Sequence, residues 1–153
     1  DFAFLGCSNL KKIIISNSVK NIANTAFWDC DNLEQITFGE SVTSIGNNAF
    51  SFHKKIKNIV IPNSVINIGK SAFEYCENLK SVVIGNSVTN IGKHAFASCK
   101  NLEKVVMGNS VTNIGKCVFY ECDNLKKIVI PQGSIEKFRN LFCERFAMKL
   151  YEE

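Results

Sequence analysis

Residues 86–102 read Asn-Ser-Val-Thr-Asn-Ile-Gly-Lys-His-Ala-Phe-Ala-Ser-Cys-Lys-Asn-Leu, and close copies of this string recur along almost the whole chain. Its phenylalanine returns every 23 residues, at positions that mark six successive copies. A period of this length is typical of a solenoid, in which each repeat is too small to bury its own apolar residues and stacks on its neighbours. The marker residues are Phe4, Phe27, Phe50, Phe73, Phe96 and Phe119.

Each repeat also contains the pattern Leu-x-x-Ile-x-Ile, first at residues 10–15 and last at 125–130. Its final apolar positions alternate with one intervening residue, which predicts a short strand with one buried face. Six copies predict a parallel six-strand sheet on one face of the solenoid. Turns rich in Gly, Pro, Asn and Ser follow, and then a second extended segment, Val-x-x-Ile-Gly. The opposite face is therefore expected to consist of short extended segments and turns.

Three further columns recur at the same step. The glycines predict a tight corner that needs either a positive φ or close packing, and the asparagines are expected to bond backbone groups of the corners. The cysteines suit a narrow apolar corner as reduced thiols, because stacked side chains point the same way and give poor disulfide geometry. These columns are Gly46, Gly69, Gly92 and Gly115; Asn9, Asn32, Asn78, Asn101 and Asn124; and Cys7, Cys30, Cys76, Cys99 and Cys122.

The period ends after Gly133. Ser134 can begin a helix, and apolar residues then follow at steps of three or four, which predicts an amphipathic helix of about four turns. Such a helix covers the last repeat of a solenoid. We therefore expect one continuous domain, with six stacked repeats over residues 1–133 and a C-terminal capping helix over 134–153. The apolar positions of that helix are Ile135, Phe138, Phe142, Phe146 and Leu150.

The first repeat is expected to be truncated, because Ala3 and Phe4 correspond to Ala26 and Phe27 of the second. This predicts that the chain is a piece of a longer protein and that any targeting segment lies upstream.

The repeat resembles the BspA-like leucine-rich repeats. The resemblance rests on Leu-x-x-Ile-x-Ile followed by Ser-Val-x-x-Ile-Gly-x-x-Ala-Phe-x-x-Cys-x-x-Leu, with Ser where leucine-rich repeats usually carry Asn or Cys, and it covers about residues 2–133. It implies a leucine-rich-repeat solenoid that binds a protein ligand, in adhesion to host or matrix proteins or to cells, at the cell surface or secreted. A cytoplasmic location is the alternative. The resemblance supplies no catalytic or ligand residues to carry over.

Composition narrows the function further. The net charge of +4 comes mainly from lysine, whereas nucleic-acid domains usually carry denser, arginine-rich patches. No apolar run is long enough for membrane insertion. The sequence contains no Cys-x-x-Cys pair, nucleophile motif, Gly-rich phosphate loop or paired carboxylate motif. We therefore expect no enzyme activity, no metal or other cofactor and no nucleic-acid partner, and we expect a monomer.

The predicted binding face is the exposed side of the six-strand sheet. Alternation points a row of mostly β-branched residues outward, and a polar, partly basic row borders it, as protein-binding surfaces often show. Two alternatives stay open: β-branched residues favour strands in any case, and the repeats could serve as a structural spacer or stalk of a larger protein. The outward row is Ile14, Thr37, Val60, Val83, Val106 and Val129, and the border is Lys12, Gln35, Asn58, Ser81, Lys104 and Lys127.

Two irregular residues each allow two interpretations. His53 replaces a column cysteine beside Lys54, Lys55 and Lys57. It indicates either a local anion-binding patch or, as we favour, a degenerate repeat whose corner faces solvent. Trp28 either packs on the outside of a corner or anchors a partner.

Overall fold

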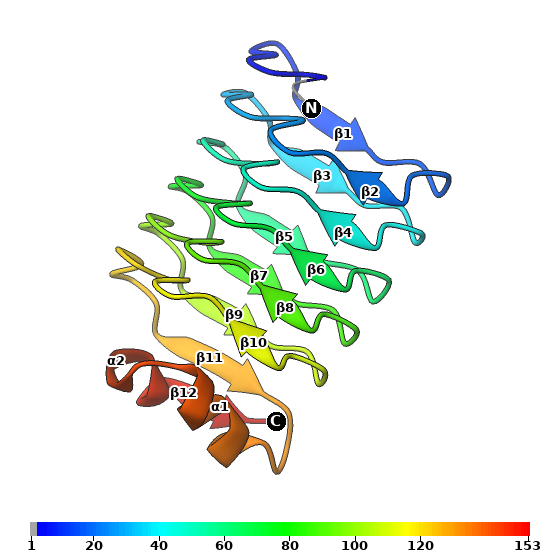
Figure 1. The fold of residues 1–153 in the computed structure, drawn as a ribbon. Helices are drawn as coiled ribbons and strands as arrows, with labels where there is room; N and C mark the ends of the chain where they lie inside the picture. The colour runs from blue at the N-terminus through cyan, green and yellow to red at the C-terminus, as the bar shows by residue number, and fades with distance from the viewer. Residues whose placement is uncertain (1–2) are drawn as a thin grey trace.

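The structure, a computed structural model, describes residues 3–153 and forms a solenoid whose turns coincide with the 23-residue repeats (Figure 1). The start of the predicted first repeat, residues 1 and 2, lies outside the described residues. Each repeat contributes one strand to a first series and, except for the last, one to a second series. The first series is β1 (Lys12–Ile14), β3 (Gln35–Thr37), β5 (Asn58–Val60), β7 (Ser81–Val83), β9 (Lys104–Val106) and β11 (Lys127–Ile130).

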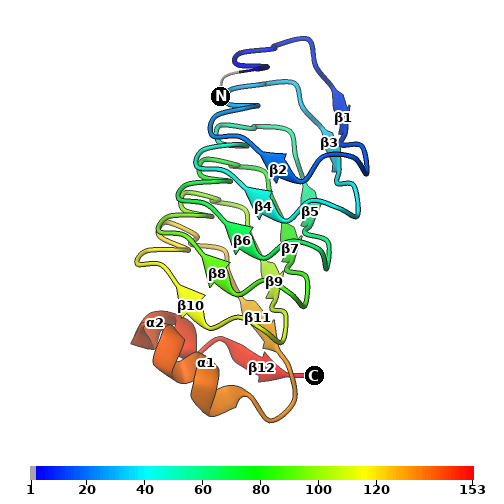
Figure 2. The ribbon, with the colours of Figure 1, turned by 45° about the vertical axis from the view of Figure 1, so that its right-hand side comes forward.

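The second series has two-residue strands and lies on a separate face of the coil (Figure 2). All its strands are parallel and joined in one five-stranded sheet, and each residue pairs with the residue 23 positions away, as Ile45 does with Ile68. The expected extended segments are thereby confirmed. They are β2 (Asn21–Ile22), β4 (Ser44–Ile45), β6 (Asn67–Ile68), β8 (Asn90–Ile91) and β10 (Asn113–Ile114).

The first series differs from the prediction in one respect. All six strands form and run parallel, but they do not make one sheet: β1 and β3 form a pair, and β5, β7, β9 and β11 form a separate sheet. The break falls between β3 and β5, where both views show a wider spacing than between the other neighbours (Figures 1 and 2).

The core is a ladder of the marker phenylalanines. The rings of Phe27 and Phe50 stack with centroids 5.2 Å apart, and those of Phe73 and Phe96 are 5.3 Å apart. These distances are close to the spacing of neighbouring strands, so one ring per turn continues the stack through the coil. Phe4, at the open end of the stack, is 49% exposed.

The glycine column is explained by close packing and not by a positive φ. A Cβ on Gly92 would lie 2.6 Å from the carbonyl carbon of Gly69, and one on Gly115 would clash with the backbone nitrogen of Lys93. Positive φ occurs elsewhere in the corner, largely at residues with side chains, including Phe52 and Tyr75.

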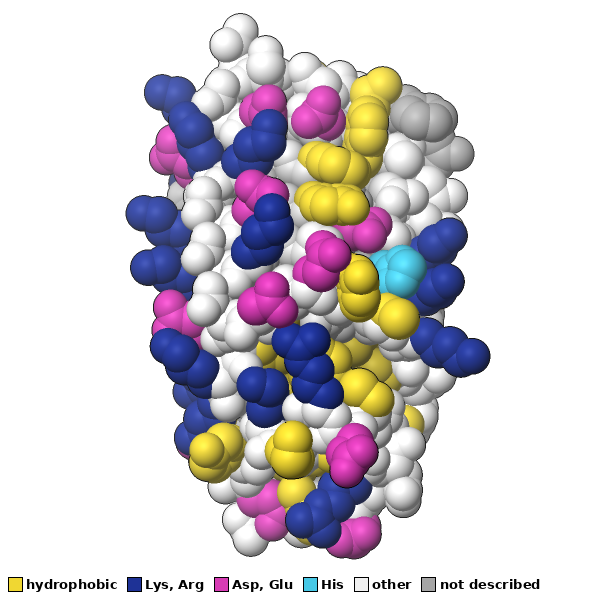
Figure 3. All heavy atoms as spheres, turned by 90° about the vertical axis from the view of Figure 1, so that its left-hand side faces the viewer, with side chains coloured by type: hydrophobic (Ala, Val, Ile, Leu, Met, Phe, Trp, Pro, Cys, Tyr) yellow, Lys and Arg dark blue, Asp and Glu magenta, His cyan; other side chains and the backbone are white. Residues whose placement is uncertain are grey.

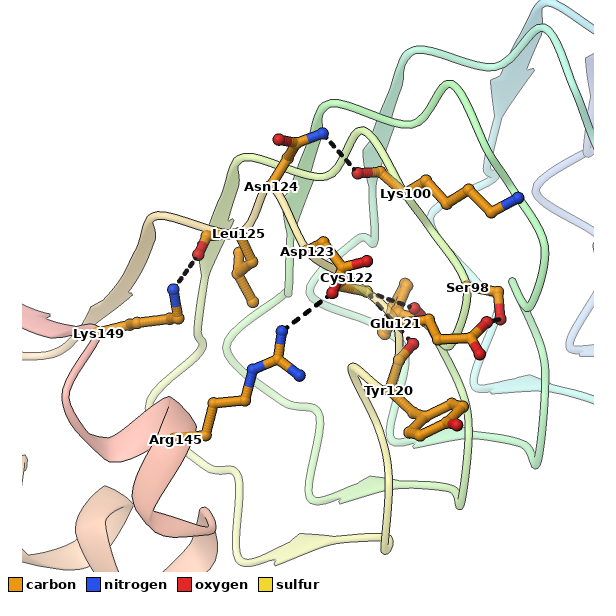
Figure 4. Close-up of polar contacts among 11 residues, drawn as sticks. Ser98, Lys100, Tyr120, Glu121, Cys122, Asp123, Asn124, Leu125, Arg145 and Lys149 are labelled. Atoms are coloured by element: carbon orange, nitrogen blue, oxygen red, sulfur yellow. Dashed lines mark hydrogen bonds and ion pairs between the residues drawn. The ribbon is translucent and has the colours of Figure 1, made fainter.

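Cysteines and asparagines fasten successive corners together. The Cys76 thiol donates to the Phe50 carbonyl at 3.3 Å. Figure 4 shows the Asn124 amide, which donates to the Lys100 carbonyl at 2.9 Å. The same bonds recur at other repeats, and they satisfy carbonyls that the narrow corner would otherwise leave unpaired. The expected role of the asparagine column is thus confirmed for Asn32, Asn78, Asn101 and Asn124.

This arrangement predicts two classes of thiol. Cys30, Cys76, Cys99 and Cys122 are buried, whereas Cys117 and Cys143 are exposed, and burial raises the pKa of the Cys30 thiol. We expect a thiol reagent to modify the exposed pair quickly in the folded protein and the buried four only after denaturation. Thiol counting under non-reducing conditions measures this, and two or more disulfides within the column would contradict it.

The C-terminal segment is shorter in helix than predicted. Helix α1 (Ile135–Leu141) ends before Phe142, which has an extended backbone, and α2 (Glu144–Ala147) is a single turn. Strand β12 (Leu150–Glu152) then pairs in parallel with β11 and adds a fifth strand to its sheet. The predicted helix over all of 134–153 is therefore wrong, because the segment must cover both the ring ladder and the edge of the sheet.

The segment still covers the apolar end of the stack, as predicted. Phe138, Phe142 and Phe146 are buried, and the Phe142 ring stacks on Phe119 at 6.0 Å. Arg145 also pairs with Asp123 at 3.1 Å (Figure 4). Over residues 3–153, the structure contains no helix that is both long and apolar enough to cross a lipid bilayer.

Candidate interaction surface

The outward row of the first strand series is exposed over its first part. Ile14 is 69% exposed, Val60 is 63% exposed and Val83 is 37% exposed, and Thr37 lies between them on the same face. No element of the described chain packs over this part of the face (Figure 2). We call the row Ile14, Thr37, Val60 and Val83 the ridge.

The last two members of the predicted row do not belong to the ridge. Val106 is half-buried, and Val129 is only 3% exposed. The prediction that Val129 points to solvent is wrong, because β12 pairs with β11 and places Tyr151 opposite Val129. The C-terminal segment thus covers this end of the face.

The predicted border is also shortened by the C-terminal segment. Lys127 is partly buried, pairs with Glu153 at 2.9 Å and lies 4.7 Å from the centroid of the Tyr151 ring. Ser81 donates to the side chain of Asn58 at 2.7 Å, which ties two border residues to each other. The exposed lysines of the predicted border are therefore Lys12 and Lys104.

A cleft of about 750 Å³ lies on this face where the sheet is interrupted. We call it the junction cleft, because it lies between the second and third repeats. Ile36 at its wall is partly exposed, whereas the equivalent Ile13 and Ile59 are buried. The residues that line it are Glu34, Gln35, Ile36, Lys54, Lys55, Lys57, Asn58, Val60 and Asn78.

The sequence of the third repeat explains the interruption. His53 occupies a cysteine position, and both of its ring nitrogens lack a hydrogen-bond partner among the described residues although the side chain is fully buried. Lys55 occupies an asparagine position and cannot make the amide bond to the preceding repeat. Two corner fastenings are therefore missing at one junction, and Phe38 adds bulk there by packing edge-on against Phe50 at 5.6 Å.

The interpretation that the His53 corner faces solvent is thus wrong for the histidine itself, which is buried. It holds for its lysine neighbours, which are exposed. The signal for the cleft was present in the sequence, as two column substitutions in one repeat, but side-chain size alone does not say whether a stack tightens or opens.

A second surface feature escaped the sequence prediction. Phe52 stacks on Tyr75 with centroids 4.6 Å apart, and Trp28 meets Phe52 edge-on at 5.4 Å. Figure 3 shows hydrophobic side chains in a row along this corner, with charged side chains on both sides. Trp28 packs on the outside of the corner, which is one of its two predicted roles. For Phe52 and Tyr75 the signal was an aromatic residue at a position where the other repeats have Gly, Asp, Ser or Glu.

The fold defines a leucine-rich-repeat solenoid. The chain belongs to the BspA-type leucine-rich repeat family, whose model matches it in six copies over residues 1–99 and 45–149. No curated protein matches the sequence.

Solved structures of bacterial leucine-rich repeat proteins have the same fold. One from Bacteroides ovatus is 35% identical, covers 85% of this chain and gives a TM-score of 0.77. The Treponema pallidum leucine-rich repeat protein is 30% identical over 94% of this chain, which corresponds to 75% of that protein, with a TM-score of 0.80. The pneumococcal vaccine antigen PcpA is 22% identical over 99% of this chain, with a TM-score of 0.80, and supports the fold alone.

The chain spans 36% of the Bacteroides ovatus protein and 36% of the pneumococcal antigen. Repeats of this family form a scaffold fold that is not enzymatic, and they serve as protein-interaction modules.

Proposed function

We propose that this solenoid is an adhesive protein-interaction module, which binds host or matrix proteins as a monomer at the cell surface or after secretion. The observation that carries the proposal is the ridge. Its aliphatic side chains protrude from a face that no other described element covers, and exposed apolar side chains grouped on one face favour a binding site.

The chemistry of the ridge supports a protein partner. Ile14, Val60 and Val83 offer apolar surface on rigid strands, and Lys12 and Lys104 lie at the border. An apolar centre with a charged border is the usual anatomy of a protein–protein interface. Rigid strands lose little conformational entropy on binding, which favours affinity. The expected partner surface is apolar at its centre and acidic at its rim.

Replacement of Val60 and Val83 by Thr tests the ridge. Thr preserves the β-branched shape and strand preference but adds a hydroxyl that a dry interface cannot hydrate. We expect this double variant to bind at least about tenfold more weakly to whichever member of a panel of purified matrix proteins the parent binds, with an unchanged melting temperature. Surface plasmon resonance on immobilised matrix proteins measures the affinity.

Ile66→Thr is the matched control, because Ile66 is also an exposed aliphatic residue, 42% exposed, but precedes β6 in the other sheet. It should leave binding unchanged. Full binding by the Val60/Val83 variant would exclude the ridge as the site. Absence of binding by the parent across the panel would favour a spacer role for the repeats.

A further inference from the structure

We infer that the junction cleft binds an extended acidic segment of a partner protein. The inference rests on the proposed function for the class of partner, but it assigns a second site, between β3 and β5, which adjoins the ridge at Val60, and a specific ligand chemistry. Three features of the cleft carry it: unpaired backbone groups, uncompensated lysines and an apolar wall.

The unpaired groups are backbone N–H groups of β3 and β5 and their flanking residues, where the strand pairing of the first series is interrupted. Between the third and fourth repeats, the backbone nitrogens of Lys80 and Ser81 both donate to the Lys57 carbonyl, and the nitrogen of Ile61 donates to the Val83 carbonyl. Within residues 3–153, the equivalent bonds from Lys57, Asn58 and Phe38 are not formed. Both walls of the cleft therefore present backbone N–H groups that can receive the carbonyls of another chain, which is the basis of recognition by strand addition.

The charges around the cleft favour an acidic ligand. Lys54 is paired with Asp31 at 3.0 Å, but Lys55 and Lys57 form no ion pair among the described residues. Glu34 supplies the one carboxylate in the lining. Two free ammonium groups against one carboxylate leave the cleft positive, so carboxylates of a partner gain charge-assisted hydrogen bonds there.

The apolar wall and the shape favour an extended segment over a small anion. Ile36 and Val60 belong to the lining beside its polar residues; Ile36 is partly exposed and Val60 is exposed. A small anion would use the lysines alone. A peptide backbone uses the lysines, the unpaired N–H groups and the apolar contact together, and it continues onto the ridge through Val60.

A charge variant tests the ligand chemistry. The probe is a fluorescein-labelled poly-glutamate peptide, with a neutral Gly-Ser peptide of equal length as reference, and fluorescence anisotropy measures the affinity. Lys55→Gln with Lys57→Gln should weaken poly-glutamate binding by about tenfold or more, the scale of losing two charge-assisted contacts. Glu34→Gln should tighten it. The matched control Lys93→Gln with Lys116→Gln removes two exposed lysines from another face and should change little.

A closure variant tests the geometry without touching a lysine. Phe38→Ile and His53→Cys restore the residue types found at the equivalent positions of other repeats. We expect the new thiol to donate to the Phe27 carbonyl, the β3–β5 ladder to form, and the amides of Lys57 and Asn58 to become protected from hydrogen exchange. The melting temperature should rise, because an unpartnered buried imidazole is removed, while poly-glutamate affinity falls by about tenfold. A variant that is more stable and binds less well distinguishes site closure from general damage.

Equal poly-glutamate binding by the parent, the charge variant and the closure variant would overturn the inference. So would tighter binding of heparin than of poly-glutamate by the parent, since the cleft would then select sulfated glycans. If the closure variant shows no new amide protection, the charge variant alone decides. None of these cleft variants changes a ridge residue. If they bind poly-glutamate as the parent does while the Val60/Val83 variant loses binding to matrix proteins, the proposed function stands and the cleft has no part in it.

Discussion

We expect a chain that lacks residues 134–153 to aggregate and to unfold at a markedly lower temperature. The deletion removes Phe138, Phe142 and Phe146, which are all buried. Because Phe142 stacks on Phe119, its loss exposes the Phe119 ring at the end of the stack. It also removes β12, which leaves β11 as a bare edge strand with unpaired backbone groups. Exposed apolar surface beside a free strand edge is the usual condition for intermolecular pairing.

A single substitution measures the same effect without a new edge. Phe142→Ala should lower the free energy of unfolding by on the order of 3 kcal/mol, as other buried Phe truncations do. Met148→Ala is the control in the same segment, because Met148 is 80% exposed, and it should have little effect. Urea denaturation gives the free energies, and light scattering follows the deletion. A truncated chain that stays monodisperse with an unchanged melting temperature would show that the C-terminal segment is not a cap.

The second large effect is expected at Gly92, in the middle of the stack. An added Cβ would lie 2.6 Å from backbone atoms of Gly69 and Lys70, and backbone, unlike a flexible side chain, cannot move aside without separating two repeats. We expect Gly92→Ala to lower the free energy of unfolding by about 3 kcal/mol or more, at the upper end of overpacking costs. Gly92 directly follows β8, which pairs with β6. Separation of the two repeats should therefore also reduce the protection of the β6 and β8 amides from hydrogen exchange.

Gly133→Ala provides the matched comparison. Gly133 has a φ of +74° but nothing within 4 Å of its Cβ position, so only backbone conformation opposes the substitution there. That cost should be about 1–2 kcal/mol. Denaturation of both variants separates the two causes. A Gly92 variant no less stable than the Gly133 variant would mean that the corner is not held by close approach of the backbones.

The repeat architecture could be predicted from the sequence because its signals are local and repeated. Each Val-x-x-Ile-Gly segment has the same neighbours one turn before and one turn after, so stacking converts a sequence period into a register of 23 residues. The strands, the ring ladder and the asparagine bonds all follow from this one rule. For the glycine column the sequence allowed two explanations, a positive φ or close packing. The structure shows that close backbone contacts between repeats are the reason.

The candidate surface was predicted less completely because it depends on where the periodicity fails. Alternation assigned an outward direction to Val129, but its burial depends on β12, which no repeat pattern encodes. The helical pattern correctly identified the phenylalanines that become buried in the C-terminal segment. The helix nevertheless ends before Phe142, whose ring takes the next position of the ring stack, 23 residues after Phe119.

The sequence by itself determined the period, the stacking direction and the identity of the core residues, because in a solenoid every repeat obtains the same contacts from its neighbours. The tertiary structure decided what happens at the irregular positions. The repeat pattern does not say whether β3 and β5 stay paired when His53 and Lys55 replace the usual Cys and Asn. The outcome depended on two opposing effects: the intact pairing of β4 with β6 holds the repeats together on one face, and the missing corner hydrogen bonds let them separate on the other. The packing of two whole repeats sets the relative strength of these effects. The junction cleft therefore opened only on the face of the first strand series.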